Sequence, residues 1–135
     1  MPEIAIDENL KRHFHLFWDN FPAPVLLLHK DRTILARNQA AEAAGMVPGT
    51  RCSDRGGAEV HRGCLAVQAL REQSAKRSVE YIEQLGVVMD SYWIPLPGHP
   101  DLYVHFGIDI TAFAAERLFP SACRGGAACT SCSGA

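Results

Sequence analysis

Near the start of the chain, hydrophobic side chains recur at helical spacing. A period of three to four residues links Leu10, Phe14, Phe17, Trp18 and Phe21. This pattern predicts an amphipathic helix that begins after Asp7, whose short carboxylate suits an N-cap, and that ends at Pro22. The exposed stripe of such a helix needs a partner, which is either the protein's own sheet or a second copy of the chain.

The next segment combines strand and helix signals. Residues 24–29 and 33–37 are apolar stretches separated by Lys30-Asp31-Arg32, which predicts a β-hairpin. Asn38 suits the N-cap of a short helix over 39–44, and Gly45 suits its end. A further helix over 64–73 would place three apolar residues on one face: Cys64, Val67 and Leu70.

Strand signals dominate the last third of the chain. Residues 78–85, 87–96 and 102–108 are three candidate strands, with turn residues at Gly86 and at 97–100. The third strand alternates, with Leu102, Val104, Phe106 and Ile108 on one face. A short helix over 112–119 follows. The order of elements indicates an α+β domain whose antiparallel sheet is covered by helices.

Several short motifs occur in the order found in the PAS family of sensory domains, which this chain resembles. The motifs are Phe21-Pro22-Ala23-Pro24-Val25, Asp31-Arg32-Thr33-Ile34, Asn38-Gln39-Ala40-Ala41-Glu42 with Gly45, Gly49 to Cys52, and Asp109-Ile110-Thr111. One departure is Arg32, which stands where the family usually has a turn glycine. The alternative is that these are simply good turn and cap residues.

The resemblance implies a five-stranded antiparallel sheet with short flanking helices and an N-terminal helix. We expect residues 1–22 to form that helix, 23–119 the PAS-like domain and 120–135 a cysteine-containing tail. The resemblance also implies that Asp109 and Thr111 mark the exit from the last strand into a signalling segment. A ligand pocket would lie between the sheet and the short helices.

Five residues are the predicted lining of that pocket: Val67, Leu70, Val104, Phe106 and Ile108. An apolar pocket with few polar groups suits a small molecule. The alternative is that the same side chains fill the core, because a small domain has little volume to spare.

The composition of the chain limits the classes of function that it can have. The chain has 135 residues, 47% of them hydrophobic, and a net charge of −2, which favours one folded domain without the basic face that nucleic acid requires. No apolar run is long enough to span a membrane, and the first residues do not resemble a secretory signal, so we expect a cytoplasmic protein.

Cysteine is the unusual feature of the sequence. The five cysteines are Cys52, Cys64, Cys123, Cys129 and Cys132. Together they could hold zinc or an iron–sulfur cluster, which makes a redox or metal sensor the alternative function. The spacing of Cys52 and Cys64 resembles the inner cysteine pair of the oxygen-sensing iron–sulfur PAS kinases, but Gly49 and Val67 occupy the outer positions. Cys64 could equally be a core residue.

Other cofactors and activities have weak support. Nothing resembles the reactive-cysteine motif of flavin photosensors, and His61 is the one candidate haem ligand near the later helix. No nucleophile, acid–base or phosphate-loop motif stands out, so we expect no enzyme, although a small enzyme on the same fold is a third hypothesis. We expect a separate output protein and a homodimer formed through the helix stripe: Leu10, Phe14, Phe17 and Trp18.

Overall fold

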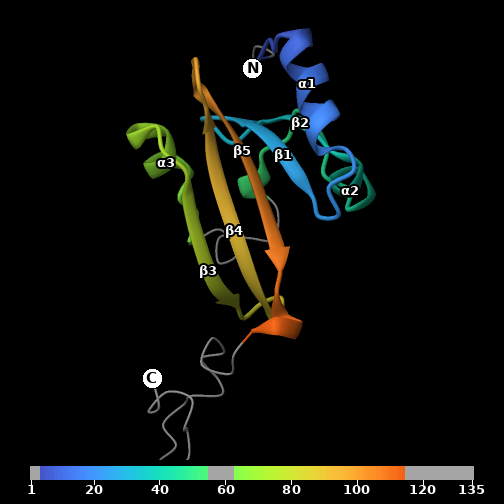
Figure 1. Cartoon of the computed structure of the whole chain (residues 1–135), viewed down its shortest axis with the longest axis vertical. Helices are drawn as coiled ribbons and strands as arrows, with labels where there is room; N and C mark the ends of the chain where they lie inside the picture. The colour runs from blue at the N-terminus through green and yellow to red at the C-terminus, as the bar shows by residue number, and fades with distance from the viewer. Residues whose placement is uncertain (1–3, 55–62, 115–135) are drawn as a thin grey trace, which may run out of the picture.

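The computed structural model describes residues 4–54 and 63–114, which form a five-stranded sheet with short helices around it (Figure 1). The helices are α1 (Glu8–Trp18), α2 (Gln39–Ala43) and α3 (Ala66–Glu72), and two 3₁₀ turns are η1 (Cys52–Asp54) and η3 (Thr111–Phe113). The strands are β1 (Val25–His29), β2 (Ile34–Arg37), β3 (Lys76–Ile82), β4 (Val87–Leu96) and β5 (His99–Asp109).

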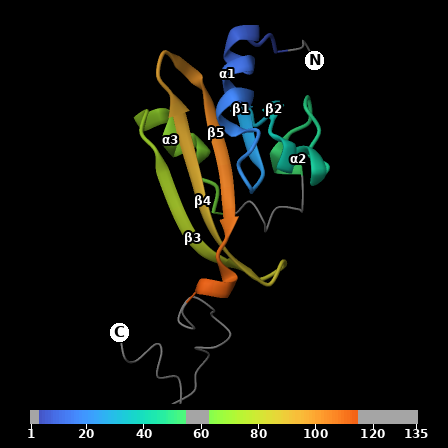
Figure 2. The same ribbon diagram turned by 45° about the vertical axis from the view of Figure 1, so that its right-hand side comes forward.

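All neighbouring strands are antiparallel, and their order across the sheet is β2-β1-β5-β4-β3. The predicted α+β class and five-stranded antiparallel sheet are confirmed. Strand β5 lies in the centre, hydrogen-bonded to β1 on one side and β4 on the other. Along this strand, α1 lies near one end of the sheet and η3 lies at the other (Figure 2).

Local signals in the sequence explain where the first helix begins and ends. The Asp7 carboxylate accepts a hydrogen bond from the backbone N–H of Asn9 at 2.7 Å, which satisfies one of the free donors of the first turn. Helix α1 ends at Trp18, earlier than the predicted end at Pro22. The reason is that the carbonyl of Trp18 accepts from the N–H of Phe21 in a turn, which leads the chain into β1.

The buried side chain of Asn38 joins the end of α1, the start of β1 and α2. Its Oδ1 atom accepts from the backbone N–H groups of Val25 at 2.9 Å and Ala41 at 3.0 Å. Its Nδ2 group donates to three backbone carbonyls: Trp18, Phe21 and Ala23. The predicted cap is therefore also the tie between the N-terminal helix and the sheet.

The two faces of the sheet are covered by different helices, and we name them after these helices. The α1 face packs Phe14 of α1 onto five buried sheet residues: Val25, Leu27, Leu35, Ala36 and Val104. The α3 face packs Ala41 of α2 and Ala66 and Ala69 of α3 onto a second set: Leu26, Leu28, Ile34, Trp93 and Tyr103. Both faces of the central strands are thus buried.

The predicted alternation in β5 is present, but the prediction of which face looks toward the short helices is wrong. Val104 packs beneath α1, and the ring of Phe106 lies 5.4 Å from that of Trp18. The residues that alternate with them along the strand, Tyr103 and His105, face α3. Because helices cover both faces of β5, the alternation alone does not distinguish them.

The predicted helix stripe packs mainly onto its own sheet. Leu10, Phe14 and Trp18 belong to the α1-face cluster, whereas the side chain of Phe17 is 76% exposed. Three of the four residues predicted for a dimer interface therefore pack against the sheet of their own chain. None of the helices among residues 4–54 and 63–114 has the length and apolar character of a membrane span.

The apolar face of α3 also differs from the prediction. Val67 is 58% exposed, and the residues that contact the sheet are Ala66 and Ala69, with Leu70 partly buried beside them. Two alanines allow the helix backbone to approach the sheet closely, which turns the larger Val67 side chain outward.

Candidate functional site

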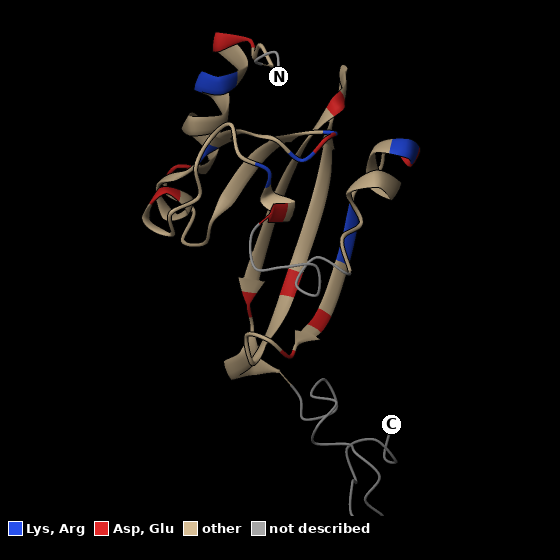
Figure 3. Cartoon of the chain, turned by 180° about the vertical axis from the view of Figure 1, so that it is seen from behind, with Lys and Arg blue, Asp and Glu red and all other residues tan. Residues whose placement is uncertain are grey.

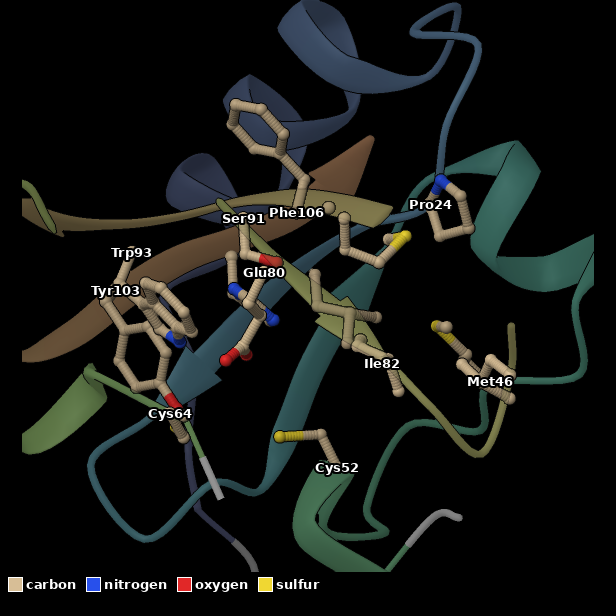
Figure 4. Close-up of a pocket in the computed structure, with 16 residues that line it drawn as sticks. Pro24, Met46, Cys52, Cys64, Glu80, Ile82, Ser91, Trp93, Tyr103 and Phe106 are labelled. Carbon is tan, nitrogen blue, oxygen red and sulfur yellow. The ribbon is translucent and has the colours of Figure 1, made fainter. Parts of the chain in front are cut away.

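A cavity of about 360 Å³ opens on the α3 face (Figure 4). Its wall is largely apolar, with residues from β1, β3, β4, β5 and the segments around η1 and α3. The lining residues are Pro24, Leu26, Met46, Cys52, Gly63, Cys64, Glu80, Ile82, Leu85, Met89, Ser91, Trp93, Tyr103, His105, Phe106 and Gly107.

Two stacked rings from adjacent central strands line part of the cavity. The imidazole of His105 on β5 lies 4.8 Å from the indole of Trp93 on β4, and the ring planes are 14° apart. The His105 Nδ1 atom is 2.8 Å from the carbonyl oxygen of Tyr92. A carbonyl only accepts, so Nδ1 is the protonated nitrogen of this ring, which fixes its orientation against Trp93.

Two glycines leave room beside the polar groups of the cavity. A β-carbon at Gly107 of β5 would come within 2.7 Å of the Met89 methyl group and 3.3 Å of the Ser91 hydroxyl. At Gly63, a β-carbon would collide with the carboxylate of Glu80. A glycine inside a strand packs nothing itself, and at Gly107 the absent β-carbon leaves room for the side chains of Met89 and Ser91.

The most unusual polar group of the cavity is the hydroxyl of Tyr103. Tyr103 is 1% exposed, and its hydroxyl oxygen is buried without a hydrogen-bond partner among the residues the structure describes. Burial raises the pKa of this phenol, and the nearby Cys52 and Cys64 side chains raise it further. The group is therefore a neutral donor whose hydrogen bond is not made by the described part of the protein.

Arg32 and two thiols surround the same corner. Arg32 adopts a left-handed backbone conformation with φ of 72°, at the turn position where the PAS resemblance places a glycine. A hydrogen bond with the Cys64 side chain raises the pKa of the Arg32 guanidinium. Burial raises the pKa of the Cys52 thiol to about 11, so Cys52 is a protonated thiol at neutral pH.

The structure describes two of the five cysteines that were predicted as metal ligands. Cys52 and Cys64 lie in the cavity wall, whereas Cys123, Cys129 and Cys132 lie outside the described residues, as does the haem candidate His61. Within residues 4–54 and 63–114, no group of three or more His, Cys, Asp or Glu side chains is placed to hold a metal ion.

The predicted exit, Asp109 and Thr111, forms a compact junction at the end of β5. The Asp109 carboxylate accepts from the Thr111 N–H at 2.9 Å. The Thr111 hydroxyl oxygen in turn accepts from the N–H of Val88 on β4 at 2.9 Å, and the N–H of Ile110 donates to the Val88 carbonyl at 2.9 Å. The end of β5 is thus held against the start of β4.

A polar network lies on the opposite side of β3 and β4 from the cavity. Asp90 accepts from the Arg77 guanidinium at 2.7 and 3.0 Å and from the Tyr92 hydroxyl at 3.1 Å. These bonds from Arg77 hold the pKa of Asp90 below its ordinary value. Basic residues mark the α3 end of β3, and acidic residues occur farther along the sheet (Figure 3).

Most of the residues predicted to line the pocket lie outside the cavity. Phe106 is one of the lining residues, but its ring points away from the other labelled side chains toward α1 (Figure 4). Leu70 supports the adjacent core, and Val67 is exposed. Val104 and Ile108 share the α1-face register with Phe106.

Sequence reasoning missed most of the cavity residues, and six of these lie at alternating positions in the central strands. They are Met89, Ser91 and Trp93 on β4 and Tyr103, His105 and Gly107 on β5. Gly107 was the available signal, because a glycine within an otherwise apolar strand marks close approach or open space.

No protein-family model and no curated protein matches the sequence. Solved structures do match. A domain of an HTR-like protein from Haloarcula marismortui is 25% identical, with a TM-score of 0.55, and the match covers 67% of this chain and 99% of that one. The PAS domain of Bordetella pertussis BvgS is 18% identical, with a TM-score of 0.63 over 85% and 94%. A sensory box sensor histidine kinase from Vibrio cholerae is 16% identical, with a TM-score of 0.53 over 75% and 86%.

Proposed function

We propose that this chain, which has the fold of a PAS domain, is a sensory module of signal transduction that binds a small molecule in the cavity on its α3 face. The observation that carries the proposal is the cavity of about 360 Å³, whose wall combines apolar side chains with a few convergent polar groups. That size and composition are typical of small-molecule sites. The similar structure from Vibrio cholerae is named a sensory box sensor histidine kinase, and the one from Bordetella pertussis BvgS is named a PAS domain, which agrees with this role.

Strand β5 connects the cavity to the predicted signalling exit. Tyr103, His105 and Gly107 line the cavity, and the same strand ends at Asp109 beside the Thr111 junction. A ligand that shifts β5 relative to β4 would act on the hydrogen bonds between Thr111 and Val88. In this proposal the junction is the element whose arrangement depends on occupancy of the cavity.

A cavity-filling variant tests the binding role. Replacing Gly107 with leucine would add a side chain to the cavity wall and force the Met89 methyl group to move. A thermal-shift screen of small, mostly apolar molecules should find compounds that raise the Tm of the wild-type protein and not that of Gly107→Leu. Val67→Leu, on the exposed side of α3, is the control for added volume. Equal shifts in wild type and Gly107→Leu would refute binding in this cavity.

Output requires a further contact, with another protein or with a second copy of the chain. Leu16 and Phe17 of α1 are each 76% exposed and remain available after the rest of the stripe has packed onto the sheet. We expect light scattering to show a dimer that Phe17→Glu dissociates, because the charge would be buried in the interface. A wild-type protein that stays monomeric at high concentration would leave a different protein as the output partner.

A further inference from the structure

We propose that Tyr103 is the specificity-determining residue of the cavity and that its hydroxyl donates a hydrogen bond to a neutral carbonyl-type oxygen of a compact, mostly apolar ligand. The inference rests on the proposed ligand-binding function. It adds the chemical class of the ligand and names the residue that recognises this ligand. It starts from the buried Tyr103 hydroxyl, which has no partner among the described residues.

A buried hydroxyl without a partner destabilises the folded protein, because it loses its hydrogen bonds to water and gains none. The other tyrosine hydroxyl on the central strands behaves differently, since that of Tyr92 donates to Asp90 at 3.1 Å. Tyr103 is nevertheless packed among apolar residues of the α3-face core, where phenylalanine would satisfy the same packing. The unsatisfied hydroxyl is explained if a ligand provides the missing partner.

The surroundings of the hydroxyl favour a ligand that accepts a hydrogen bond. The Cys52 thiol is protonated. The Arg32 guanidinium donates hydrogen bonds and cannot accept them, so the side chains near the Tyr103 hydroxyl mainly offer donors. Thiol sulfur atoms are weak acceptors and do not satisfy a phenol well. The positive charge of Arg32 also acts on this hydroxyl, and the Asp31 carboxylate acts on it in the opposite sense.

Glu80 argues for a neutral ligand over a carboxylate. Its side chain lines the same cavity and lies against Gly63 (Figure 4). A ligand carboxylate would be held in a largely apolar enclosure together with this second acidic group, which electrostatic repulsion disfavours. A ketone, aldehyde, amide or ester oxygen accepts from Tyr103 without that repulsion.

The first test is the stability of the ligand-free protein. Tyr103→Phe removes only the hydroxyl, and we expect its Tm to rise by about 2–4 °C. Tyr92→Phe is the matched control, because it removes a hydroxyl that already has a partner, and its Tm should fall. A fall in Tm for Tyr103→Phe as large as that for Tyr92→Phe would show that the Tyr103 hydroxyl is already satisfied and would overturn the assignment.

The second test uses two probes of nearly the same shape, acetophenone with a carbonyl and ethylbenzene without one. Titrations followed by ¹H–¹⁵N NMR should show acetophenone binding wild type about five- to tenfold more tightly than Tyr103→Phe. Ethylbenzene should bind Tyr103→Phe at least as tightly as wild type. Benzoate should bind wild type more weakly than acetophenone does.

The outcomes separate this inference from the function on which it rests. If both neutral probes bind wild type and acetophenone binds Tyr103→Phe equally well, the cavity is a binding site and the role of Tyr103 is refuted. Tighter binding of benzoate would refute the neutral class of ligand. If neither neutral probe perturbs the signals of the cavity residues in wild type, the inference fails together with the proposed function.

Discussion

Replacing Asn38 with alanine would remove five hydrogen bonds made by one buried side chain. The N–H groups of Val25 and Ala41 would lose their acceptor, and the carbonyls of Trp18, Phe21 and Ala23 would lose a donor. Each buried backbone group left unsatisfied costs about 1–3 kcal/mol. Counting the two N–H groups and part of the carbonyl loss, we expect Asn38→Ala to lower the free energy of unfolding by about 3–5 kcal/mol.

An aspartate at the same position separates the two halves of this network. Its carboxylate would still accept from the N–H groups of Val25 and Ala41 but would face three carbonyl oxygens with no proton to donate. Burial and those carbonyls would raise its pKa in the folded state above the unfolded value of about 3.9. Asn38→Asp should therefore be more stable at pH 4 than at pH 8 relative to wild type, since the protonated acid is favoured by folding and stability is lost as the pH rises through the folded-state pKa.

Urea denaturation followed by circular dichroism measures both effects. Asn20→Ala is the control, because Asn20 is an exposed residue of the same type and its replacement should change the free energy of unfolding by less than about 0.5 kcal/mol. A loss below about 1 kcal/mol for Asn38→Ala would refute the reasoning. It would mean that water replaces the amide without cost and that α1 is not tied to the sheet through this side chain.

Three further predictions follow from the packing and charge of the sheet. Phe106→Ala should lower the free energy of unfolding by about 3 kcal/mol in the same assay, because the ring fills the space beneath α1. Val67→Ser should change it by less than about 0.5 kcal/mol, and a loss of 2 kcal/mol would mean that α3 packs through the originally predicted face. Asp90→Asn should destabilise the protein at pH 7, and its difference from wild type should shrink as the pH falls below 3.8. The bonds from Arg77 depress the pKa of Asp90, so their stabilisation is present above the ordinary value of 3.8 and lost as the pH falls through the folded-state pKa.

Local chemistry made much of the fold predictable from the sequence. The caps at Asp7 and Asn38 occur where short polar side chains precede apolar periodicity, and strand β4 spans the predicted residues 87–96. These features depend on neighbours in the sequence. The end of α1 was less predictable because it depends on a turn at Trp18 and on Asn38, which lies twenty residues away.

The candidate site was less predictable because it depends on which face of a central strand each helix covers. In β5 one alternating set is apolar, with Val104 and Phe106, and it suggested the face toward the short helices. The other set, with Tyr103, His105 and Gly107, is more polar and was not predicted to line a pocket. A ligand site reverses that expectation, since a cavity needs empty space and a few polar groups, whereas a packed core needs neither. In a PAS fold with both faces of the sheet covered, the more polar set on a central strand is therefore the better candidate for the ligand face, and the hydroxyl of Tyr103 is where that reasoning is most directly testable.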